Sequence, residues 1–170
     1  MSRLFIMTTA PRLDSDITLR DYRPSSENRD WEAMYALDLD CFEPAFRFSR
    51  RAMRSFAQAP HAITLLLESR TINNAAQLAA FSIAHIEGST AYVVTLDVAS
   101  AFRRRGLARR LMAETELRAR TAGAHEVALH VFTGNTAAIQ LYESLGYNRT
   151  GLAENFYARN LDALIYRKKL

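Results

Sequence analysis

The chain alternates apolar and polar residues in several short stretches, which is the pattern of β-strands that bury one face. The first stretch covers 16–24, where Pro24 ends the strand. Three further apolar segments occupy 61–69, 76–86 and 90–98, and the joins between them are turn-like. This succession predicts one isolated strand followed by an antiparallel meander.

Helical spacing replaces the alternation between the first strand and the second. Apolar residues recur there every three or four positions, as they do on one face of a helix. These residues are Trp31, Met34, Leu37 and Cys41. Pro44 interrupts the pattern, and Ser49 is suited to cap a second, short helix over 50–57.

The second half of the chain carries two longer helical patterns with a strand between them. One helix is predicted over 106–121, and Gly123 follows its last turn. Its buried face consists of Ala108, Leu111, Met112, Thr115 and Ala119. A β-branched strand follows at 125–132. Asn135 then caps a second helix, which Gly146 ends.

The order of these elements predicts an α+β fold, that is, a mixed α/β protein. Two final strands within 147–170 complete a central sheet of about six to seven strands, with helices on both faces. Neither an internal repeat nor a linker divides the chain. We therefore expect a single domain over 16–170, preceded by a flexible leader at 1–15.

Composition places the chain among ordinary globular proteins, because 49% of its 170 residues are apolar and 24% are charged. The single cysteine, Cys41, cannot form an internal disulfide and is expected to be a small buried residue. The apolar run at 4–7 is too short for a signal peptide, and no window reaches the ~18 apolar residues of a membrane span. We expect a cytoplasmic protein without a membrane partner.

Five arginines surround one glycine in "ASAFRRRGLARRLM", residues 99–112, where a predicted strand gives way to a helix. The first N–H groups of a helix lack internal partners and carry partial positive charge, so an anion can bind there. Gly106 lets the backbone approach a ligand closely, and Ala108 leaves room beyond it. The pattern favours a phosphate-binding loop, with a solvated basic face or a nucleic-acid patch as alternatives. Nucleic acid is disfavoured because Phe102 is the only aromatic residue in the stretch.

Segments of the second half together resemble the GNAT superfamily of acetyl-CoA-dependent acetyltransferases. The family's pyrophosphate loop, Arg/Gln-x-x-Gly-x-Gly/Ala, corresponds to 103–108. Asn135 opens the helix that comes after the one predicted at 106–121. "LYESLGY" at 141–147 is among the family's most recognisable stretches. The resemblance covers about 16–170 and is strongest over 93–168. "CFEPAFRFS" and "NFY…DALIY" further resemble the branch that acetylates the N-termini of proteins, ribosomal proteins among them.

The resemblance implies a GNAT-like, mostly antiparallel mixed sheet in which one parallel pair of strands splays apart around acetyl-CoA. The pantetheine arm would bond to the strand before the loop, and the pyrophosphate would rest on the amides of the loop. The residues implied to bind the co-substrate are Leu96, Asp97, Val98, Arg103, Arg104, Arg105, Gly106, Leu107, Ala108, Arg109 and Asn135. No metal ion is implied.

Acetyl transfer to an amine requires a neutral nucleophile, a proton donor for the departing thiolate and a donor to the oxyanion. Tyr142 matches the family's phenol that faces the CoA sulfur, so it is the candidate acid; a packed core tyrosine is the alternative. His130 stands where the branch often carries a glutamate, and it is the candidate base. A structural histidine, a water chain or Glu126 on the same strand face are the alternatives.

The acceptor is expected to be a primary amine, above all the α-amine of a protein or peptide N-terminus. Phe156 and Tyr157 are expected to contact it, because the loop before the last strand often borders the family's acceptor pocket. A small amine such as a polyamine or an antibiotic is the first alternative, and a non-catalytic acyl-CoA-binding module is the second. A monomer or homodimer without a nucleic-acid partner is expected.

The remaining candidate side chains are expected to be structural. Three histidines at strand ends are predicted to be surface residues: His61, His85 and His125. They do not cluster with Cys41, so no metal site is predicted. Asp38 and Asp40 are expected on a solvated helix face rather than against a cationic acceptor.

Overall fold

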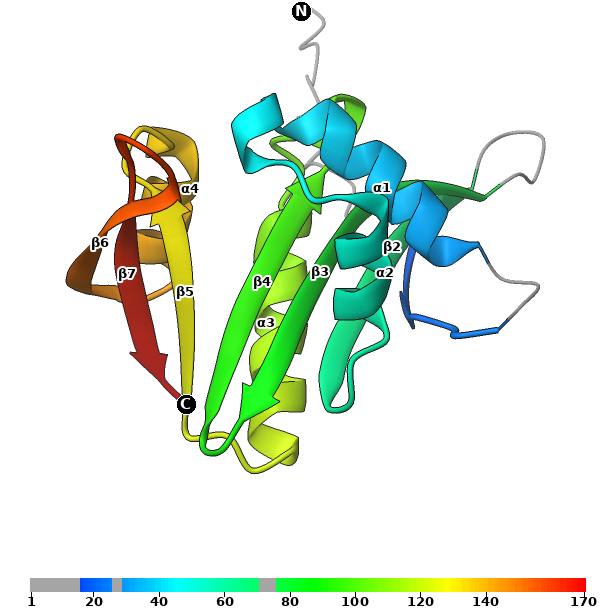
Figure 1. Ribbon diagram of the computed structural model, residues 1–170. Helices are drawn as coiled ribbons and strands as arrows, with labels where there is room; N and C mark the ends of the chain where they lie inside the picture. The colour runs from blue at the N-terminus through cyan, green and yellow to red at the C-terminus, as the bar shows by residue number, and fades with distance from the viewer. Residues whose placement is uncertain (1–15, 26–28, 71–75) are drawn as a thin grey trace, which may run out of the picture.

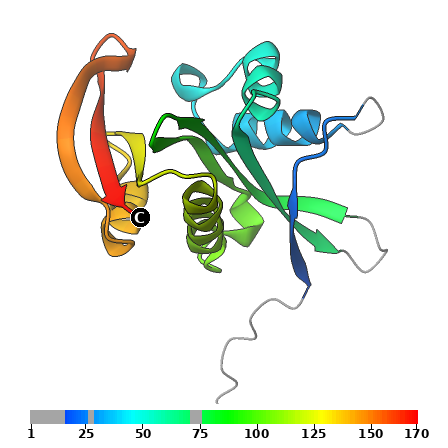
Figure 2. The same cartoon turned by 90° about the horizontal axis from the view of Figure 1, so that it is seen from below.

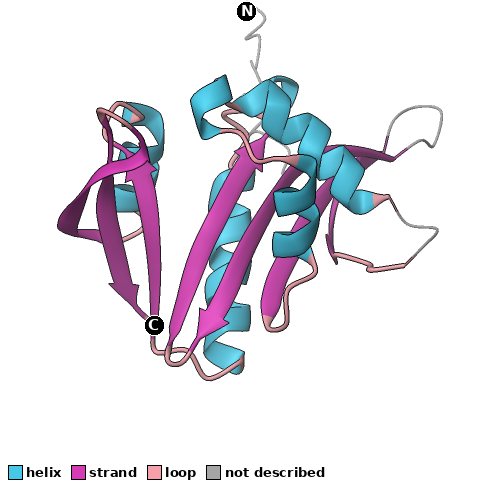
Figure 3. Ribbon diagram, viewed as in Figure 1, coloured by secondary structure: helices cyan, strands magenta, loops and turns pink. Residues whose placement is uncertain are grey.

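The computed structural model describes residues 16–25, 29–70 and 76–170, and it arranges them around one seven-stranded sheet (Figures 1 and 3). The predicted leader, 1–15, lies outside the described residues. The strands are β1 (Ile17–Asp21), β2 (Ala62–Arg70), β3 (Ala76–Glu87), β4 (Thr90–Val98), β5 (Glu126–Phe132), β6 (Asn148–Ala158) and β7 (Leu161–Lys169). The helices are α1 (Asp30–Cys41), α2 (Arg50–Ala57), α3 (Leu107–Thr121) and α4 (Thr136–Ser144), with short 3-10 turns η1 (Pro44–Phe46) and η2 (Ser100–Phe102).

The sheet runs in the order β1-β2-β3-β4-β5-β7-β6 and is antiparallel except between β4 and β5. These two parallel strands pair only over Thr90–Val93 and Glu126–Leu129. Beyond these residues their pairing ends and the strands diverge, as Figure 1 shows. The mixed sheet with one splayed parallel pair is therefore confirmed.

The four helices cover both faces of the sheet, as Figure 2 shows. α3 packs against β2, β3 and β4, and α4 lies on the same side, whereas α1 and α2 pack against the opposite face. Gly106 is the N-cap of α3, and Gly123 and Gly146 follow α3 and α4 with φ values of 89° and 85°. That left-handed conformation is typical of glycine after a helix, so the predicted helix ends are confirmed.

β4 contains a bulge at the point where it separates from β5. Thr95 pairs with Ile83 and Val93 pairs with Ala84, which leaves Val94 as an extra residue without a partner on β3. A bulge reverses the side-chain alternation of the strand beyond it. The bulge therefore decides which side chains of β4 face α1.

Asp97 faces α1 as a result. It pairs with Phe81, which belongs to the apolar cluster formed with Met34 and other residues of α1 and α2. Directly paired residues of neighbouring strands share one face of the sheet. The Asp97 carboxylate therefore enters the interior between β4 and α1.

Three expectations about single side chains are wrong. Asp38 is fully buried rather than solvated, because it faces the sheet beside Leu37, whereas Asp40 is exposed as expected. His85 is half-buried, because α2 covers it and its Nε2 lies 2.9 Å from the carbonyl oxygen of Phe56. Cys41 is only half-buried, and His61 and His125 are exposed as expected. The polar exceptions lie where α1 and α2 meet the sheet.

Candidate active site

The junction between β4 and α3 has the backbone form of an anion-binding loop. Arg104 and Gly106 both have positive φ, 63° and 80°. No side chain caps the first turn of α3, so its N–H groups remain available to a ligand. A Cβ placed on Gly106 would meet no heavy atom within 4 Å, so the surface above the loop is open.

The arginines of this segment have different surroundings. Those that line the cavity above the loop are Arg103, Arg104 and Arg109. Arg105 does not line it; its guanidinium carbon lies 5.1 Å from the centroid of the Phe102 ring. Arg110 donates to the carbonyl oxygen of Ile17 at 3.0 Å and ties α3 to β1. Only part of the basic cluster therefore points to a ligand.

Two cavities adjoin along the gap between β4 and β5. The first, at the loop, is lined by every predicted co-substrate residue except Arg105. The second is lined by β4 from Val93 to Leu96, by β5 from Leu129 onward and by the chain between α1 and α2. The residues that line both are Cys41, Phe42, Leu96, Asn135, Ala138 and Tyr142. These six mark the place where the cavities meet.

Tyr142 lies at this junction on α4. It is 7% exposed, and its hydroxyl forms no hydrogen bond with any other described residue. Burial raises the pKa of Tyr142 above that of a free phenol, and the nearby Tyr157 and Asp97 raise it further. The phenol therefore keeps its proton at neutral pH and has no protein acceptor for it.

His130 projects from β5 into the second cavity, and its ring stacks on Phe156 with centroids 4.2 Å apart. Burial lowers the pKa of His130, and the positive charge of Arg167 lowers it further. The imidazole is therefore neutral near neutral pH. Glu126, the alternative base, lines neither cavity and instead forms an ion pair with Arg167 at the far end of β5.

Aromatic rings enclose the second cavity. Phe46 of η1 contacts Phe132 of β5 and Tyr157 of β6, with centroid distances of 4.8 and 5.0 Å. The Tyr157 hydroxyl donates to the carbonyl oxygen of His130 at 3.3 Å. Phe156 is 50% exposed on the outer side of His130. Sequence reasoning named Phe156 and Tyr157, of which Tyr157 lines the cavity and Phe156 does not, and it missed Phe46, although Phe46 lies in the quoted segment "CFEPAFRFS".

Two buried carboxyl groups lie beside the first cavity. Asp97, which was expected among the co-substrate residues, lines it, whereas Asp38, which was expected on a solvated helix face, lines neither cavity. Asp97 is 1% exposed; its Oδ1 accepts from Thr95 Oγ1 at 2.5 Å, and its Oδ2 has no partner. Asp38 Oδ2 accepts from the backbone N–H of Phe48 at 3.0 Å, and its Oδ1 likewise has none. Burial raises the pKa of Asp97 to about 8, and the charge of Asp38 contributes.

In the described ranges, no helix is long and apolar enough to cross a membrane. Among the same residues, no three His, Cys, Asp or Glu side chains are grouped so that they could hold a metal ion.

The parallel strands of the mixed sheet part beside a loop of the phosphate-binding type, which is the arrangement that the sequence resemblance implied for an acetyltransferase domain. Residues 31–147 match the model of the acetyltransferase (GNAT) family. The chain belongs to that family.

Curated relatives include an enzyme named [ribosomal protein bS18]-alanine N-acetyltransferase. The Salmonella typhimurium protein is 37% identical over 81 residues, which are 48% of this chain and 55% of that protein. The Escherichia coli protein of the same name is 33% identical over 81 residues, with the same shares covered. The chain thus spans about half the length of the curated relatives that it matches.

Solved structures extend the similarity over nearly the whole fold. The crystal structure of the ribosomal-protein-S18-alanine N-acetyltransferase from Escherichia coli superposes with a TM-score of 0.75 and 27% identity, covering 90% of this chain and 93% of that chain. Arabidopsis thaliana NAA60 in complex with a bisubstrate analogue gives a TM-score of 0.77 at 21% identity, covering 91% and 99%. The second likeness concerns the fold alone.

Proposed function

We propose that this chain is an N-acetyltransferase that moves the acetyl group of acetyl-CoA to the α-amine of a protein or peptide N-terminus. The observation that carries the proposal is the position of Tyr142. This residue lines both the first cavity, at the loop (the loop cavity), and the second cavity, which aromatic rings enclose (the aromatic cavity). A thioester reaching along β4 from the loop would meet an amine entering from the other cavity at this residue.

The loop cavity suits the phosphate end of acetyl-CoA. Uncapped N–H groups at the start of α3 and the guanidinium groups of Arg104 and Arg109 would bind the diphosphate. The edge of β4 beyond Val93 has no pairing with β5, so its backbone groups can bond to an extended pantetheine arm. Asn135 caps α4 by accepting from the N–H of Ala138 at 3.2 Å, which leaves its side-chain NH₂ for the ligand.

Two side chains would move the protons of the reaction. Acetyl-CoA supplies an activated acyl carbon, to which the amine nitrogen bonds as the carbon–sulfur bond breaks and sulfur takes the electron pair. Tyr142 would give its proton to that sulfur. Because Tyr142 is buried, the thiolate beside it would also be shielded from water, which makes the sulfur a stronger base. His130, neutral near neutral pH, would accept the proton that the amine loses.

The aromatic cavity favours an N-terminal residue with a small, uncharged side chain. Its walls are the rings of Phe46, Phe132 and Tyr157, and among the described residues Glu43 is the only carboxylate that lines it. An α-amine with a pKa of roughly 8 is partly neutral under physiological conditions, unlike a lysine amine near 10.4. Both features favour a peptide N-terminus over a polyamine, which would bring several charges into the cavity.

The experiment that tests this function is thiol release from acetyl-CoA with a panel of acceptors. Peptides beginning with Ala, Ser or Gly are expected to turn over fastest, peptides beginning with Lys or Glu more slowly, and polyamines slowest. Turnover confined to small amines would refute the N-terminal acceptor. Tight CoA binding without turnover on either set would refute catalysis.

A further inference from the structure

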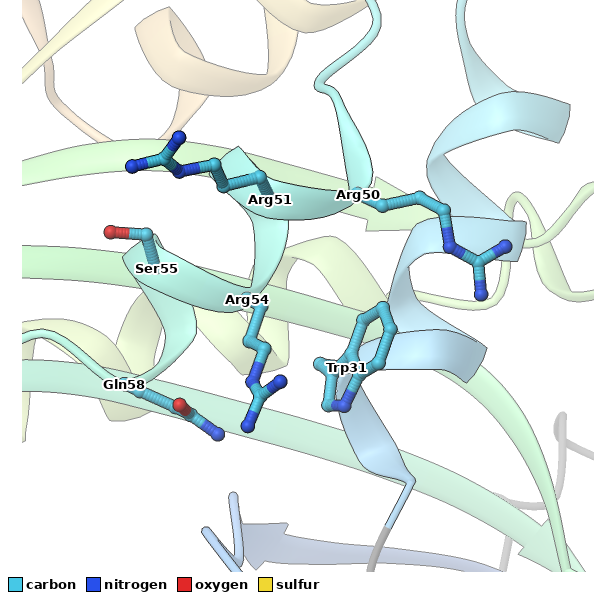
Figure 4. A pocket seen from close by; sticks show the side chains of 6 residues that line it. All are labelled: Trp31, Arg50, Arg51, Arg54, Ser55 and Gln58. Atoms are coloured by element: carbon cyan, nitrogen blue, oxygen red, sulfur yellow. The ribbon is translucent and has the colours of Figure 1, made fainter.

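A separate pocket lies on the outer surface of α1 and α2. None of its residues lines the two cavities of the candidate active site. The residues that line it are Trp31, Arg50, Arg51, Arg54, Ser55 and Gln58. Three of the six are arginines and none is acidic. Figure 4 shows the indole between the side chains of Arg50 and Arg54, with Arg51 extending away from it.

Aromatic rings hold two of these arginines in place. The guanidinium carbons of Arg50 and Arg54 lie 5.4 and 5.8 Å from the Trp31 ring centroid. Arg50 also lies 5.2 Å from the centroid of Tyr35, one helical turn further along α1. Cation–π contact fixes a guanidinium group while its N–H groups stay free to donate. Two cations are thus held at one indole.

Little negative charge balances them. Glu32 approaches Arg50 at 3.7 Å, but its closer partner is Arg29 at 2.6 Å. Neither Arg51 nor Arg54 forms an ion pair with any described residue. The sequence of α2, RRAMRSFA, contains no acidic residue. Adjacent cations without counter-charges repel one another, and a bound anion would relieve that repulsion.

We propose that this pocket binds single-stranded nucleic acid, with phosphates on the N–H groups of Arg50 and Arg54 and a base stacked on a guanidinium plane that Trp31 holds in place. Planar guanidinium groups match the oxygens of a phosphate, and the same planes give a base a stacking partner. An acidic peptide would use the charges but not the planar stacking surface. The expectation of no nucleic-acid partner rested on the arginines at 103–110, where Phe102 is the only aromatic residue of the stretch. Around Trp31, by contrast, arginines and aromatic rings meet only after folding.

The chain supplies its own probe, because Trp31 is its only tryptophan. The full chain would be titrated with a mixed-sequence RNA of about ten nucleotides, a length within the site sizes of single-strand binders, while Trp31 emission is recorded. We expect saturable quenching, weakened about sevenfold when salt rises from about 50 to about 200 mM, as two phosphate contacts on a single strand require. Anisotropy of a labelled RNA gives a second, independent measure of affinity.

A matched pair of variants separates this pocket from general attraction to a basic protein. Arg50→Gln with Arg54→Gln should weaken RNA binding at least tenfold. Arg120→Gln with Arg149→Gln removes the same charge from exposed positions on α3 and β6, and should change affinity less than twofold. Thermal unfolding of each variant shows that it is folded.

The other outcomes overturn the proposal. Equal weakening in the two double variants would mean that binding follows net charge alone. An unchanged Trp31 emission in the presence of bound RNA would place the RNA elsewhere. Polyglutamate that binds as tightly as RNA, with the same loss in the Arg50 and Arg54 variant, would make the pocket a site for acidic peptides. None of these results depends on acetyl transfer.

Discussion

Tyr142 and Tyr147 meet edge to face, with ring centroids 5.8 Å apart, yet their hydroxyl groups have opposite surroundings. The Tyr147 hydroxyl donates to the side chain of Glu116 on α3 at 3.0 Å. The Tyr142 hydroxyl has no partner among the described residues and lies where the two cavities meet. Of two adjacent buried phenols, one is therefore bonded within the protein and the other is free to act on a substrate.

The first prediction concerns Tyr142→Phe. Loss of a positioned acid typically lowers a rate by about 10²–10⁴-fold, so kcat should fall within that range at saturating substrates. The free energy of unfolding should change by less than about 0.5 kcal/mol, because no hydrogen bond within the protein is lost. Steady-state kinetics and urea denaturation measure the two quantities.

Tyr147→Phe is the matched control. It removes the hydroxyl that donates to Glu116, and a hydrogen bond to a charged group contributes about 1.5–3 kcal/mol. Stability should therefore fall while kcat stays near that of the parent. If Tyr147→Phe lowers kcat as much as Tyr142→Phe does, the packing of the pair matters and Tyr142 is not the acid.

The second prediction concerns pH and Arg167. Because burial and the charge of Arg167 lower the pKa of His130, protonation of its imidazole should reduce activity only below about pH 6.5, in a step separate from the fall that protonation of the acceptor α-amine causes below about pH 8. Arg167→Met removes the positive charge, so the pKa of His130 should rise and the acidic limb of kcat/KM should move to higher pH. The pH profile of kcat/KM measures that shift.

Lys169→Met supplies the comparison. Lys169 pairs with Glu126 in the register of β5 and β7, whereas Arg167 pairs with Ala128, one step nearer to His130 along the same face. The same change in charge at Lys169 should therefore move the acidic limb less. Equal shifts in both variants, or no shift in either, would mean that protonation of His130 does not cause the acidic limb.

Local patterns and the family resemblance together anticipated the frame of this site. The alternation along β4, the arginine–glycine loop and the capping residue Asn135 are features of consecutive residues, so they could be recognised before folding. The candidate role of Tyr142 followed from the stretch "LYESLGY", because periodicity alone favours a packed core tyrosine. Sequence signals thus suffice where neighbours in the chain define the structure.

Contacts between distant segments were missed for a physical reason. The bulge at Val94 turns Asp97 toward α1, and nothing in the sequence of β4 marks that irregularity. Asp38 looks like an ordinary polar position on a helix until the sheet is placed beside it. Phe46 meets Tyr157 only because the fold brings η1 over β6. Such pairs depend on tertiary geometry rather than on local composition.

The third prediction tests the loop by means of Gly106→Ala. A φ of 80° costs an L-residue about 1–2 kcal/mol, so the variant should lose stability by that amount. The added methyl group would also occupy the open surface where the diphosphate is proposed to rest. We expect the Kd for acetyl-CoA, measured by calorimetry, to rise at least tenfold.

Gly88→Ala separates strain from binding. Gly88 has a φ of 59° in the turn between β3 and β4, and it also has open space around its Cα. The stability loss should be similar, and the Kd for acetyl-CoA should not change. If both variants weaken acetyl-CoA equally, backbone strain explains the loss and the loop does not hold the diphosphate.

The fourth prediction concerns Asp97→Asn and the dependence of stability on pH. The pKa of Asp97 is about 8 in the folded chain, against an ordinary value of 3.8. Between those two values the folded carboxyl keeps its proton while the unfolded one is ionised. Unfolding then releases a proton, so the stability of the parent falls as pH rises and levels off above about pH 8.

An amide does not titrate, so the variant should lack that fall. Asp97→Asn should be more stable than the parent by on the order of 1–3 kcal/mol at about pH 8, the cost of a buried polar group without a partner. The gain should be clearly smaller at about pH 5, where the parent carboxyl still holds its proton in the folded chain. Asp40→Asn, at an exposed position of α1, should change the free energy of unfolding by less than about 0.5 kcal/mol. Urea denaturation at both pH values decides the matter, because equal gains at the two would mean that Asp97 does not titrate in this range.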